Sequence, residues 1–380
     1  MSKLLRCVFC VVIVLFFILQ FGCSKVAAPR EEPVGSLAEE EAKGENTTVS
    51  EEAAGEWWSA PQTGSMKLAD LPDPDLSKGP FTIGVAINDL VLPWTIDVWN
   101  GFEKSAEEYK NLDLSLFDCK NNPEGTLKVH GDIQNLKPDL VVYYNWVGGA
   151  GDKMAEWCVE NKIPEIEIDA PYGEQAWYYG VNNIEIGQLL GKKMAEWVLE
   201  NWSGEDIWIV NSVEYESGED VYHRTSESRK TFLDTVGDSV NIMNINEEGK
   251  SDELNNIEGV EVGMSNMSEW LTAHPDARHV VVFSSFDAAG VGMYRGAKNQ
   301  NRLGDCIFGS IEGAPNLREL FLEEDTEGRY IGTVAMFPEK YGEGCLKMAW
   351  DILTGYAPPK RVTIFYDWLD KDNIGKYYPE

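Results

Sequence analysis

Residues 81–109, with the sequence FTIGVAINDLVLPWTIDVWNGFEKSAEEY, decide the fold of this chain. Residues 81–87 are apolar and rich in β-branched side chains, which predicts a buried strand. Asn88 and Asp89 end that strand, and a helix can begin at Pro93, after which apolar residues recur at helical spacing. Such a loop between strand and helix lies at the carboxyl edge of a parallel sheet, where open α/β folds bind ligands.

The same alternation of strand-length and helix-length segments continues to residue 365. Further strands are predicted at 112–117, 140–144, 165–168, 178–181, 207–210, 240–245, 280–283, 306–310, 330–335 and 362–365. Further helices are predicted at 126–136, 154–161, 184–201, 221–236, 253–273, 288–299, 316–323 and 338–354. Strands separated by helices imply right-handed crossovers. The sequence therefore predicts an α/β protein with two doubly wound parallel-sheet lobes.

Composition restricts the class of protein. The chain has 380 residues, 43% of them hydrophobic, which is enough for about two domains with buried cores. The net charge of -32 argues against a nucleic-acid partner, because a phosphate backbone requires a basic surface. The histidines lack metal-ligand spacing, and no enzyme motif is complete. We therefore expect no metal site, no cofactor and no enzymatic activity. The sequence leaves open whether four cysteines are free or paired: Cys119, Cys158, Cys306 and Cys345.

The N-terminus indicates export to the cell envelope or periplasm. Lys3 and Arg6 precede an apolar run at residues 7–19, which is short for a membrane span. Residues 1–23 resemble a bacterial lipoprotein signal, in which Cys23 would carry lipid and anchor the protein to the membrane. Gln20 stands where such signals have an aliphatic residue, and an ordinary secretory signal or an uncleaved anchor is the alternative. Residues 24–79 are rich in Glu, Ala, Pro, Gly and Ser, which predicts a disordered tether.

Several motifs over residues 80–380 together resemble the type I periplasmic binding proteins, in particular the ribose- and galactose/glucose-binding receptors of ABC importers. The motifs are Leu92-Pro93-Trp94, DCKNNP at 118–123, IPEIEID at 163–169, Val181-Asn182-Asn183 with Gly187, TAHPD at 272–276, Phe286-Asp287-Ala288 and EGAP at 312–315. The resemblance implies an N-lobe of residues 80–182 plus 337–365 and a C-lobe of residues 183–336 plus 366–380. The chain would cross three times between them, with Asn182, Asn183, Phe337 and Tyr366 near the hinge.

The resemblance also implies a function. Such proteins capture one small ligand, most often a sugar, in the cleft between the lobes and deliver it to an ABC permease. We expect this chain to bind a sugar-like ligand, as a monomer. Two alternatives share the fold: a receptor that serves a membrane chemosensor or kinase, and an exported enzyme.

In the N-lobe, the resemblance places the ligand near residues that follow the strands. Trp94 stands where the family has a sugar-stacking aromatic residue, and a core tryptophan is the structural alternative. Asp169 matches an acidic ligand contact, although it could simply end a strand. Asn88 and Asp89 offer polar groups or form a plain turn, and Trp146 could add an aromatic wall.

In the C-lobe, Arg229 stands where the family has an arginine that reaches ligand oxygens. Arg224 competes for that role, and a solvated helix arginine is the alternative. Glu312 stands in place of the family's cleft aspartate and reaches one methylene further. Asp287 is expected to cap a helix.

Three positions depart from the family pattern. Phe286 and Met336 replace polar ligand contacts, and Ala170 stands where the ribose-binding members have an arginine. Leaving a ligand hydroxyl unpaired costs about 1–3 kcal/mol. The ligand is therefore expected to differ from ribose and to present more apolar surface than a simple hexose, with Phe286 and Met336 in contact with it.

Overall fold

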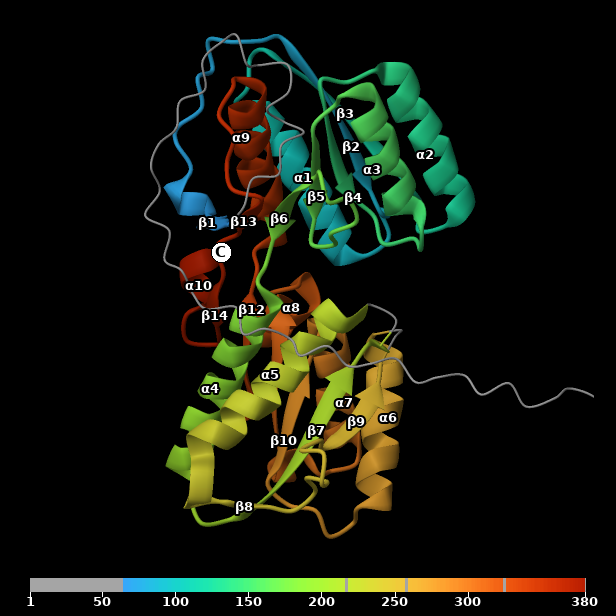
Figure 1. Cartoon of the computed structure of the whole chain (residues 1–380). Coiled ribbons are helices and arrows are strands. Elements are labelled where there is room, and N and C mark those ends of the chain that lie inside the picture. Colours follow the sequence, from blue (N-terminus) through green and yellow to red (C-terminus); the bar gives the residue numbers. More distant parts are fainter. Residues whose placement is uncertain (1–63, 216–217, 257–258, 324–325, 380) are drawn as a thin grey trace, which may run out of the picture. The chain divides into compact units, whose positions relative to one another are not determined.

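The computed structural model describes residues 64–215, 218–256, 259–323 and 326–379 (Figure 1). The expected signal segment with Cys23 and residues 24–63 of the expected tether lie outside the described residues. Over the described ranges, no helix is both long enough and apolar enough to cross a membrane. The chain forms two α/β lobes, each built on its own sheet, which confirms the predicted fold class.

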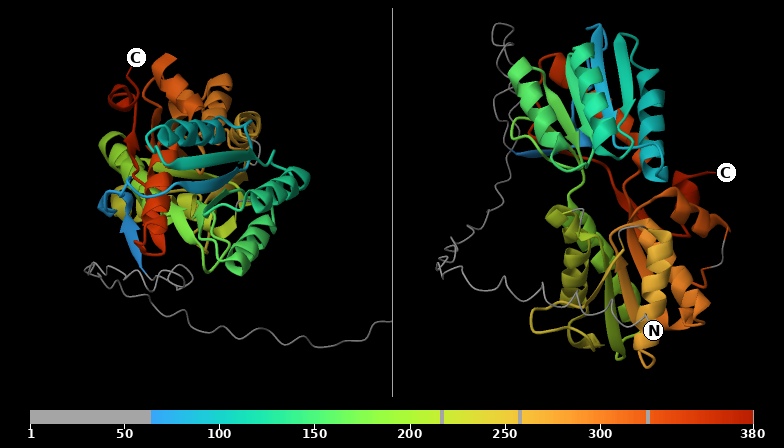
Figure 2. Two further views of the ribbon diagram at one scale, coloured as in Figure 1. Left: turned by 90° about the horizontal axis from the view of Figure 1, so that it is seen from above. Right: turned by 90° about the vertical axis from the view of Figure 1, so that its right-hand side faces the viewer.

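The first lobe has a fully parallel, seven-stranded sheet in the order β1-β13-β6-β5-β4-β2-β3. Its strands are β1 Ser65–Lys67, β2 Phe81–Ile87, β3 Leu112–Asp118, β4 Leu140–Tyr144, β5 Glu165–Ile168, β6 Trp177–Gly180 and β13 Arg361–Thr363. Its helices are α1 Pro93–Ala106, α2 Pro123–Leu136, α3 Ala150–Asn161 and α9 Tyr341–Leu353. Successive strand residues enter two different cores: Val85 packs with α1 and α9, and Ala86 packs with α2 and α3. Helices accordingly cover both faces of this sheet (Figure 2).

The second lobe has a sheet in the order β14-β12-β11-β10-β7-β8, and β9 also pairs with β7. Its strands are β7 Asp206–Val213, β8 Asn241–Ile242, β9 Asp252–Asn255, β10 Val280–Ser284, β11 Cys306–Glu312, β12 Tyr330–Ala335 and β14 Asp367–Leu369. Its helices are α4 Asn183–Asn201, α5 Gly218–Val236, α6 Val260–Ala273, α7 Asp287–Asn299, α8 Pro315–Glu323 and α10 Ile374–Tyr377. Val281 packs with α4 and α5, whereas Val282 packs with α6 and α7.

The chain passes between the two sheets three times. It leaves the first sheet after β6, returns after β12, and leaves again after β13 to form β14. The connecting residues are 181–182, 336–337 and 364–366. All carboxyl ends of the parallel strands in one sheet lie at one edge, so the polar residues that follow these strands gather there.

Residues 64–79 differ from the prediction of a tether that reaches residue 79. Ser65–Lys67 forms β1, which pairs with β13, and Leu71 is buried in the core of the first lobe. The side chains of Lys347 and Trp350 donate hydrogen bonds to backbone oxygens in this segment, at 3.0 and 2.8 Å. Backbone hydrogen bonds at a sheet edge hold a short polar segment that composition alone assigns to a linker.

Three further elements differ from the prediction. The helix expected at 253–273 begins only at Val260, after Gly259 with φ 81°, and Asp252–Asn255 is instead a strand. The strand expected at 240–245 is shortened to Asn241–Ile242. The sequence pattern does not predict the antiparallel strand β14. All of these lie at or near a sheet edge, where pairing with a neighbour rather than apolar pattern decides the structure.

Candidate functional site

Asn88 and Asp89 follow β2, and both are fully buried. The Asp89 carboxylate accepts hydrogen bonds from the backbone N–H groups of Val91 and Leu92, at 2.8 and 2.9 Å, and from the Asn88 amide at 2.8 Å. It thereby stabilises the loop before α1, whose own N-cap position is a leucine without side-chain capping. The structure therefore gives Asp89 a role in holding the loop.

Trp94 lies in the core at the start of α1, and its side chain is 8% exposed. Its indole donates a 2.7 Å hydrogen bond to the Tyr144 hydroxyl and packs edge-to-face on Tyr341. Trp146, which follows β4, is 41% exposed and packs edge-to-face on Tyr144. The two tryptophans thus share Tyr144, and Trp146 is the one whose indole remains accessible to a ligand.

Asp169 follows β5 with a left-handed backbone, φ 56°. Its Oδ1 accepts from the Val181 N–H and the Tyr341 hydroxyl, both at 3.3 Å. A Cβ on Gly180 would lie only 2.4 Å from this oxygen, so a glycine is needed there. Burial raises the pKa of Asp169 to about 6, although the positive charge of Arg224 acts in the opposite direction.

Arg224, the arginine that competes with Arg229 for the ligand-binding role, lies on α5 and is buried. Its Nε donates to Asn183 Oδ1 at 2.8 Å, and its Nη1 donates to the Ser285 carbonyl at 3.2 Å. The guanidinium also lies 5.0 Å from the centre of the Phe286 ring. Its charge lowers the pKa values of Asp169 and Tyr144 in the first lobe and of Glu312 in the second. Arg224 therefore acts electrostatically on groups from both lobes.

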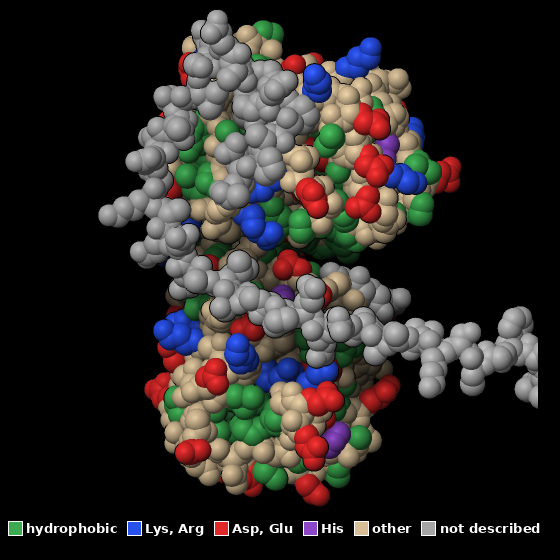
Figure 3. Space-filling view, viewed as in Figure 1, with side chains coloured by type: hydrophobic (Ala, Val, Ile, Leu, Met, Phe, Trp, Pro, Cys, Tyr) green, Lys and Arg blue, Asp and Glu red, His purple; other side chains and the backbone are tan. Residues whose placement is uncertain are grey.

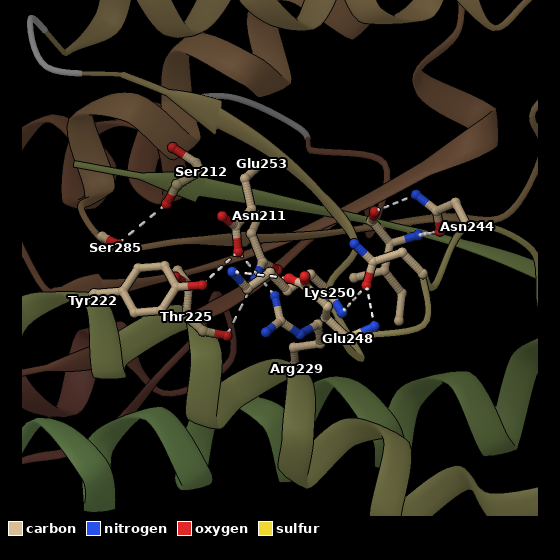
Figure 4. Close-up of polar contacts among 12 residues, drawn as sticks. Asn211, Ser212, Tyr222, Thr225, Arg229, Asn244, Glu248, Lys250, Glu253 and Ser285 are labelled. Carbon is tan, nitrogen blue, oxygen red and sulfur yellow. Dashed lines mark hydrogen bonds and ion pairs between the residues drawn. The ribbon is translucent and has the colours of Figure 1, made fainter. Parts of the chain in front are cut away.

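Arg229, the arginine favoured by the sequence, has another partner. Its Nη1 forms a 3.1 Å ion pair with Glu253 on β9 (Figure 4). The hydroxyls of Tyr215 and Tyr222 donate to the same carboxylate, at 2.5 and 2.6 Å. The sequence pattern predicts a helix from residue 253, where the structure has β9, and therefore gives no sign of the acid that pairs with Arg229.

Glu312 and Asp287 form a pair of carboxyl groups in the second lobe. Glu312 ends β11 with φ 137°, and its Oε2 accepts from the Asp287 N–H at 3.2 Å. Burial, together with the nearby Asp287, raises the pKa of Glu312 well above its ordinary value. The raised pKa favours the protonated form of this carboxyl group, and in that form it can donate a hydrogen bond.

Asp287 is the first residue of α7 and does not cap it, contrary to the expectation; Phe286 occupies the N-cap position. The Asp287 carboxylate accepts from the hydroxyls of Ser310 and Thr333, at 2.5 and 2.8 Å, and from the Ala314 N–H at 2.6 Å. These bonds connect α7 to β11, to β12 and to the residue before α8. Burial raises the pKa of Asp287 to about 6.

Of the remaining expected residues, Phe286 lies between β10 and α7, whereas Asn182, Met336 and Phe337 lie at the crossings. Phe286 is partly buried beneath Arg224, and Met336 is buried in a core. Phe337 has φ 54° and stacks on Phe365. Asn182 caps α4 through the Ile184 N–H, at 3.1 Å.

Two contacts near the crossings were not foreseen. The Tyr366 hydroxyl donates to Glu185 at 2.8 Å, which connects the third crossing to α4. Arg318 on α8 donates to Asp97 on α1, joining the two lobes directly, and it lies over the Tyr378 ring at 4.4 Å.

The described residues contain no group of His, Cys, Asp and Glu side chains that could hold a metal ion. All four described cysteines are free and buried, which answers the question that the sequence left open. What the site offers is the guanidinium group of Arg224, the ionisable carboxyl groups of Asp169 and Glu312, and the accessible indole of Trp146. These groups suit hydrogen bonding to a polar ligand with an apolar face.

Comparison with known proteins agrees with this architecture. No curated protein matches the chain. Similar solved structures include an ABC transporter periplasmic solute-binding protein from Actinobacillus succinogenes 130z with bound D-allose, at 17% identity and TM-score 0.65, covering 79% of this chain and 100% of that one. Another is an ABC transporter solute-binding protein from Bacillus halodurans C-125 with bound myo-inositol, at 19% identity and TM-score 0.63, covering 79% and 97%.

A third similar structure is the periplasmic binding protein of the arabinose ABC transporter from Shewanella sp. ANA-3, at 15% identity and TM-score 0.61, covering 78% of this chain and 94% of that one. At these identities the likeness concerns the fold. The family assignment comes from the sequence itself, because the periplasmic binding protein domain matches residues 83–357. The chain therefore belongs to the periplasmic binding protein domain family, whose members bind solutes and are not enzymes.

Proposed function

We propose that this protein is exported, captures a small sugar-like ligand between its two lobes and delivers it to an ABC permease. The observation that carries the proposal is Arg224, a buried cation whose charge acts on Asp169 of one lobe and Glu312 of the other. A ligand that bonds to groups on both lobes stabilises the closed arrangement, and this is how such binding proteins shift their population on binding.

The polar groups suit a polyhydroxylated ligand. The bonds from Arg224 to Asn183 and Ser285 hold the guanidinium in one orientation, so less conformational entropy is lost when it binds a ligand oxygen. Asp169 accepts hydrogen bonds when ionised, and Glu312, whose raised pKa favours the protonated form, can donate one in that form. A sugar or cyclitol hydroxyl can serve as either partner. A fixed carboxylate ligand would suit only the donors.

The aromatic groups suit the C–H face of a sugar ring. Trp146 presents an accessible indole beside Tyr144, and Phe286 supplies a second ring beneath Arg224. The bound D-allose and myo-inositol of the similar structures have this combination of hydroxyl groups and apolar faces. They support the ligand class proposed here, and their ABC transporters support delivery to a permease rather than to a chemosensor or kinase.

The place of action follows from the family and the N-terminus. Periplasmic binding proteins work outside the cytoplasm, and the predicted signal segment with Cys23 would anchor this one to the membrane as a lipoprotein. Replacing Cys23 by serine should move the protein from the membrane fraction to the soluble fraction of the envelope. If the variant stays membrane-bound, the lipidation proposal is wrong and an uncleaved anchor explains the membrane attachment.

The ligand is tested with a thermal-shift panel of sugars, cyclitols and nucleosides. A bound ligand raises stability by mass action, by about 2.7 kcal/mol at a hundredfold excess over Kd. Stabilisation by a sugar or cyclitol is the expected result. If no compound stabilises the protein, and mass spectrometry finds none that co-purifies, the proposed ligand class is wrong.

The site is tested with two arginines on the same helix. Arg224→Gln should weaken binding of the panel's best ligand by about tenfold to a hundredfold, because charge-assisted bonds contribute about 1.5–3 kcal/mol each. Arg229→Gln is the matched control, since Arg229 is also buried but pairs with Glu253. It should lower stability and leave the affinity unchanged. Equal loss of affinity in both variants would contradict this site.

A further inference from the structure

The first lobe contains a cavity of about 530 Å³ that the interlobe site does not use. It lies between α3 and the residues that connect β5 to β6. Its volume is within the range of small-molecule sites, about 300–1,000 Å³. Five acidic residues line it: Asp152, Glu156, Glu160, Glu165 and Glu174. None of the described residues that line it is a lysine, arginine or histidine.

Glu165 distinguishes this cavity from an ordinary acidic surface. It is the first residue of β5 and is only 3% exposed. The side chain of Cys158, also in the cavity wall, forms a hydrogen bond with its carboxyl group, but its Oε1 has no hydrogen-bond partner among the described residues. The buried Oε1 of Gln175, also in the cavity wall, has no described partner either. Native proteins rarely leave buried acceptors unpaired, because each loses its hydration without compensation. Two such acceptors beside one cavity indicate that a ligand supplies the donors.

The charge of the cavity decides what kind of donor fits. Glu165 has a raised pKa because of burial and of the neighbouring Glu167. Glu167 is already satisfied, since it accepts from the N–H groups of Tyr172 and Gly173, each at 2.7 Å. Lys360 adds a positive charge near Glu167. A cation beside Glu165 would restore its ionised form. Acidic side chains also gather on the outer face of this lobe near α2 and α3 (Figure 3), which attracts cations.

The cavity wall favours an organic cation over a metal ion. Calcium and magnesium require six or more oxygen ligands, and no described cluster of acidic, histidine or cysteine side chains converges in that way. Val159, Ile163 and the Tyr172 ring line the same cavity. The Tyr172 ring packs directly on Gly151 at the start of α3, where a Cβ would lie 2.2 Å from it. This wall offers a fixed apolar surface for a short hydrocarbon chain.

We propose that this cavity is a second binding site, separate from the interlobe site, for a small primary alkylammonium compound. Its ammonium group donates hydrogen bonds to Glu165 and Gln175, and its hydrocarbon chain lies along Tyr172. An ammonium group has three donors, which is enough for both unpaired oxygens and one water or rim carboxylate.

The site is tested by isothermal titration of the full-length protein at low salt near pH 7.5. The probe is 1,4-diaminobutane, and 1,4-butanediol of the same length serves as the uncharged control. Calcium chloride tests for a metal site. The expected result is binding of the diamine alone, at one site per chain. Absence of diamine binding up to about 10 mM, or binding of calcium at this cavity, would overturn the proposal.

Variants of the cavity wall test whether the diamine binds in this cavity. Glu165→Gln should weaken its binding by at least about tenfold, because a charge-assisted hydrogen bond is lost. Glu103→Gln, an exposed acid on α1, is the matched control and should bind like the parent. Unchanged binding in Glu165→Gln overturns the proposal. If that variant does not fold, Gln175→Leu replaces it, and an affinity loss of about fivefold or more is expected; no loss there also refutes the site.

The variant Arg224→Gln distinguishes binding in the cavity from binding at the interlobe site. That variant should bind 1,4-diaminobutane like the parent, whatever it does to the sugar-like ligand. Loss of diamine binding in Arg224→Gln would place the amine in the interlobe site and overturn the proposal.

Discussion

The protonation state of Asp169 should decide how tightly the ligand binds. Burial raises its pKa to about 6, even though Arg224 lies nearby. An ionised carboxylate accepts hydrogen bonds from ligand hydroxyl groups at both oxygens, whereas the protonated form loses part of this capacity. Affinity should therefore increase as the pH rises through about 6.

The size of the effect follows from the fraction of ionised Asp169. With a pKa of about 6, roughly a tenth of the molecules are ionised near pH 5 and more than roughly nine-tenths near pH 7.5. If only the ionised form binds, Kd rises about tenfold at the lower pH, or about 1.4 kcal/mol. Asp169→Asn cannot ionise. It should bind at least about tenfold more weakly than the parent near pH 7.5, and its affinity should not increase between about pH 5 and pH 7.5.

Isothermal titration with the best ligand of the panel measures this dependence. Titrations in two buffers of different ionisation enthalpy, near pH 6, should show release of about half a proton per ligand bound. Asp287 also has a pKa of about 6, but it is enclosed by Ser310, Thr333 and Ala314, and the Asp169→Asn variant separates the two groups. Parent affinity that is equal at both pH values, or an unchanged pH dependence in Asp169→Asn, would refute this reasoning.

Three further predictions concern stability and binding, with stability measured by urea unfolding. Burial raises the Asp351 pKa to about 7, and its Oδ2 has no partner among the described residues. The contribution of this group to stability is therefore present at low pH and is lost as the pH rises through 7. Asp351→Asn should stabilise the protein by about 1–2 kcal/mol near pH 8 and not near pH 5. Trp94→Ala should cost about 3–5 kcal/mol because it empties a core position, whereas Trp146→Ala should change stability by less than about 0.5 kcal/mol and reduce ligand affinity in titrations. Gly180→Ala should cost about 1–3 kcal/mol, because its Cβ would meet Asp169 and Tyr178; unchanged stability would contradict the close approach.

Most of the fold could be predicted from local pattern. Residues 81–87 form a strand, as both their β-branched composition and their apolar run predict, and Pro93 begins the following helix. Each βαβ unit repeats these local features, so the alternation along the chain was enough to predict two parallel sheets. Edge elements were different: β1 and β9 are short and polar, and they exist because a neighbouring strand supplies their hydrogen bonds.

The candidate site was predictable in position but not in the role of each residue. The carboxyl ends of parallel strands place Asn88, Asp169 and Glu312 at sheet edges, which follows from chain order alone. Which arginine faces them depends on what else is buried nearby. Arg224 and Arg229 lie five positions apart on α5, and only the fold reveals that Glu253 from β9 neutralises Arg229.

The role of the aromatic side chain of Trp94 likewise depends on the residues buried near it. Its position after Pro93 suggested a ligand-stacking role, but the hydrogen bond to Tyr144 and the packing on Tyr341 draw its indole into the core. Local sequence thus specifies elements, because backbone preference and apolar periodicity act over a few residues. The assignment of each polar or aromatic side chain to core, ion pair or ligand depends on partners distant in sequence, and only tertiary packing brings those partners together.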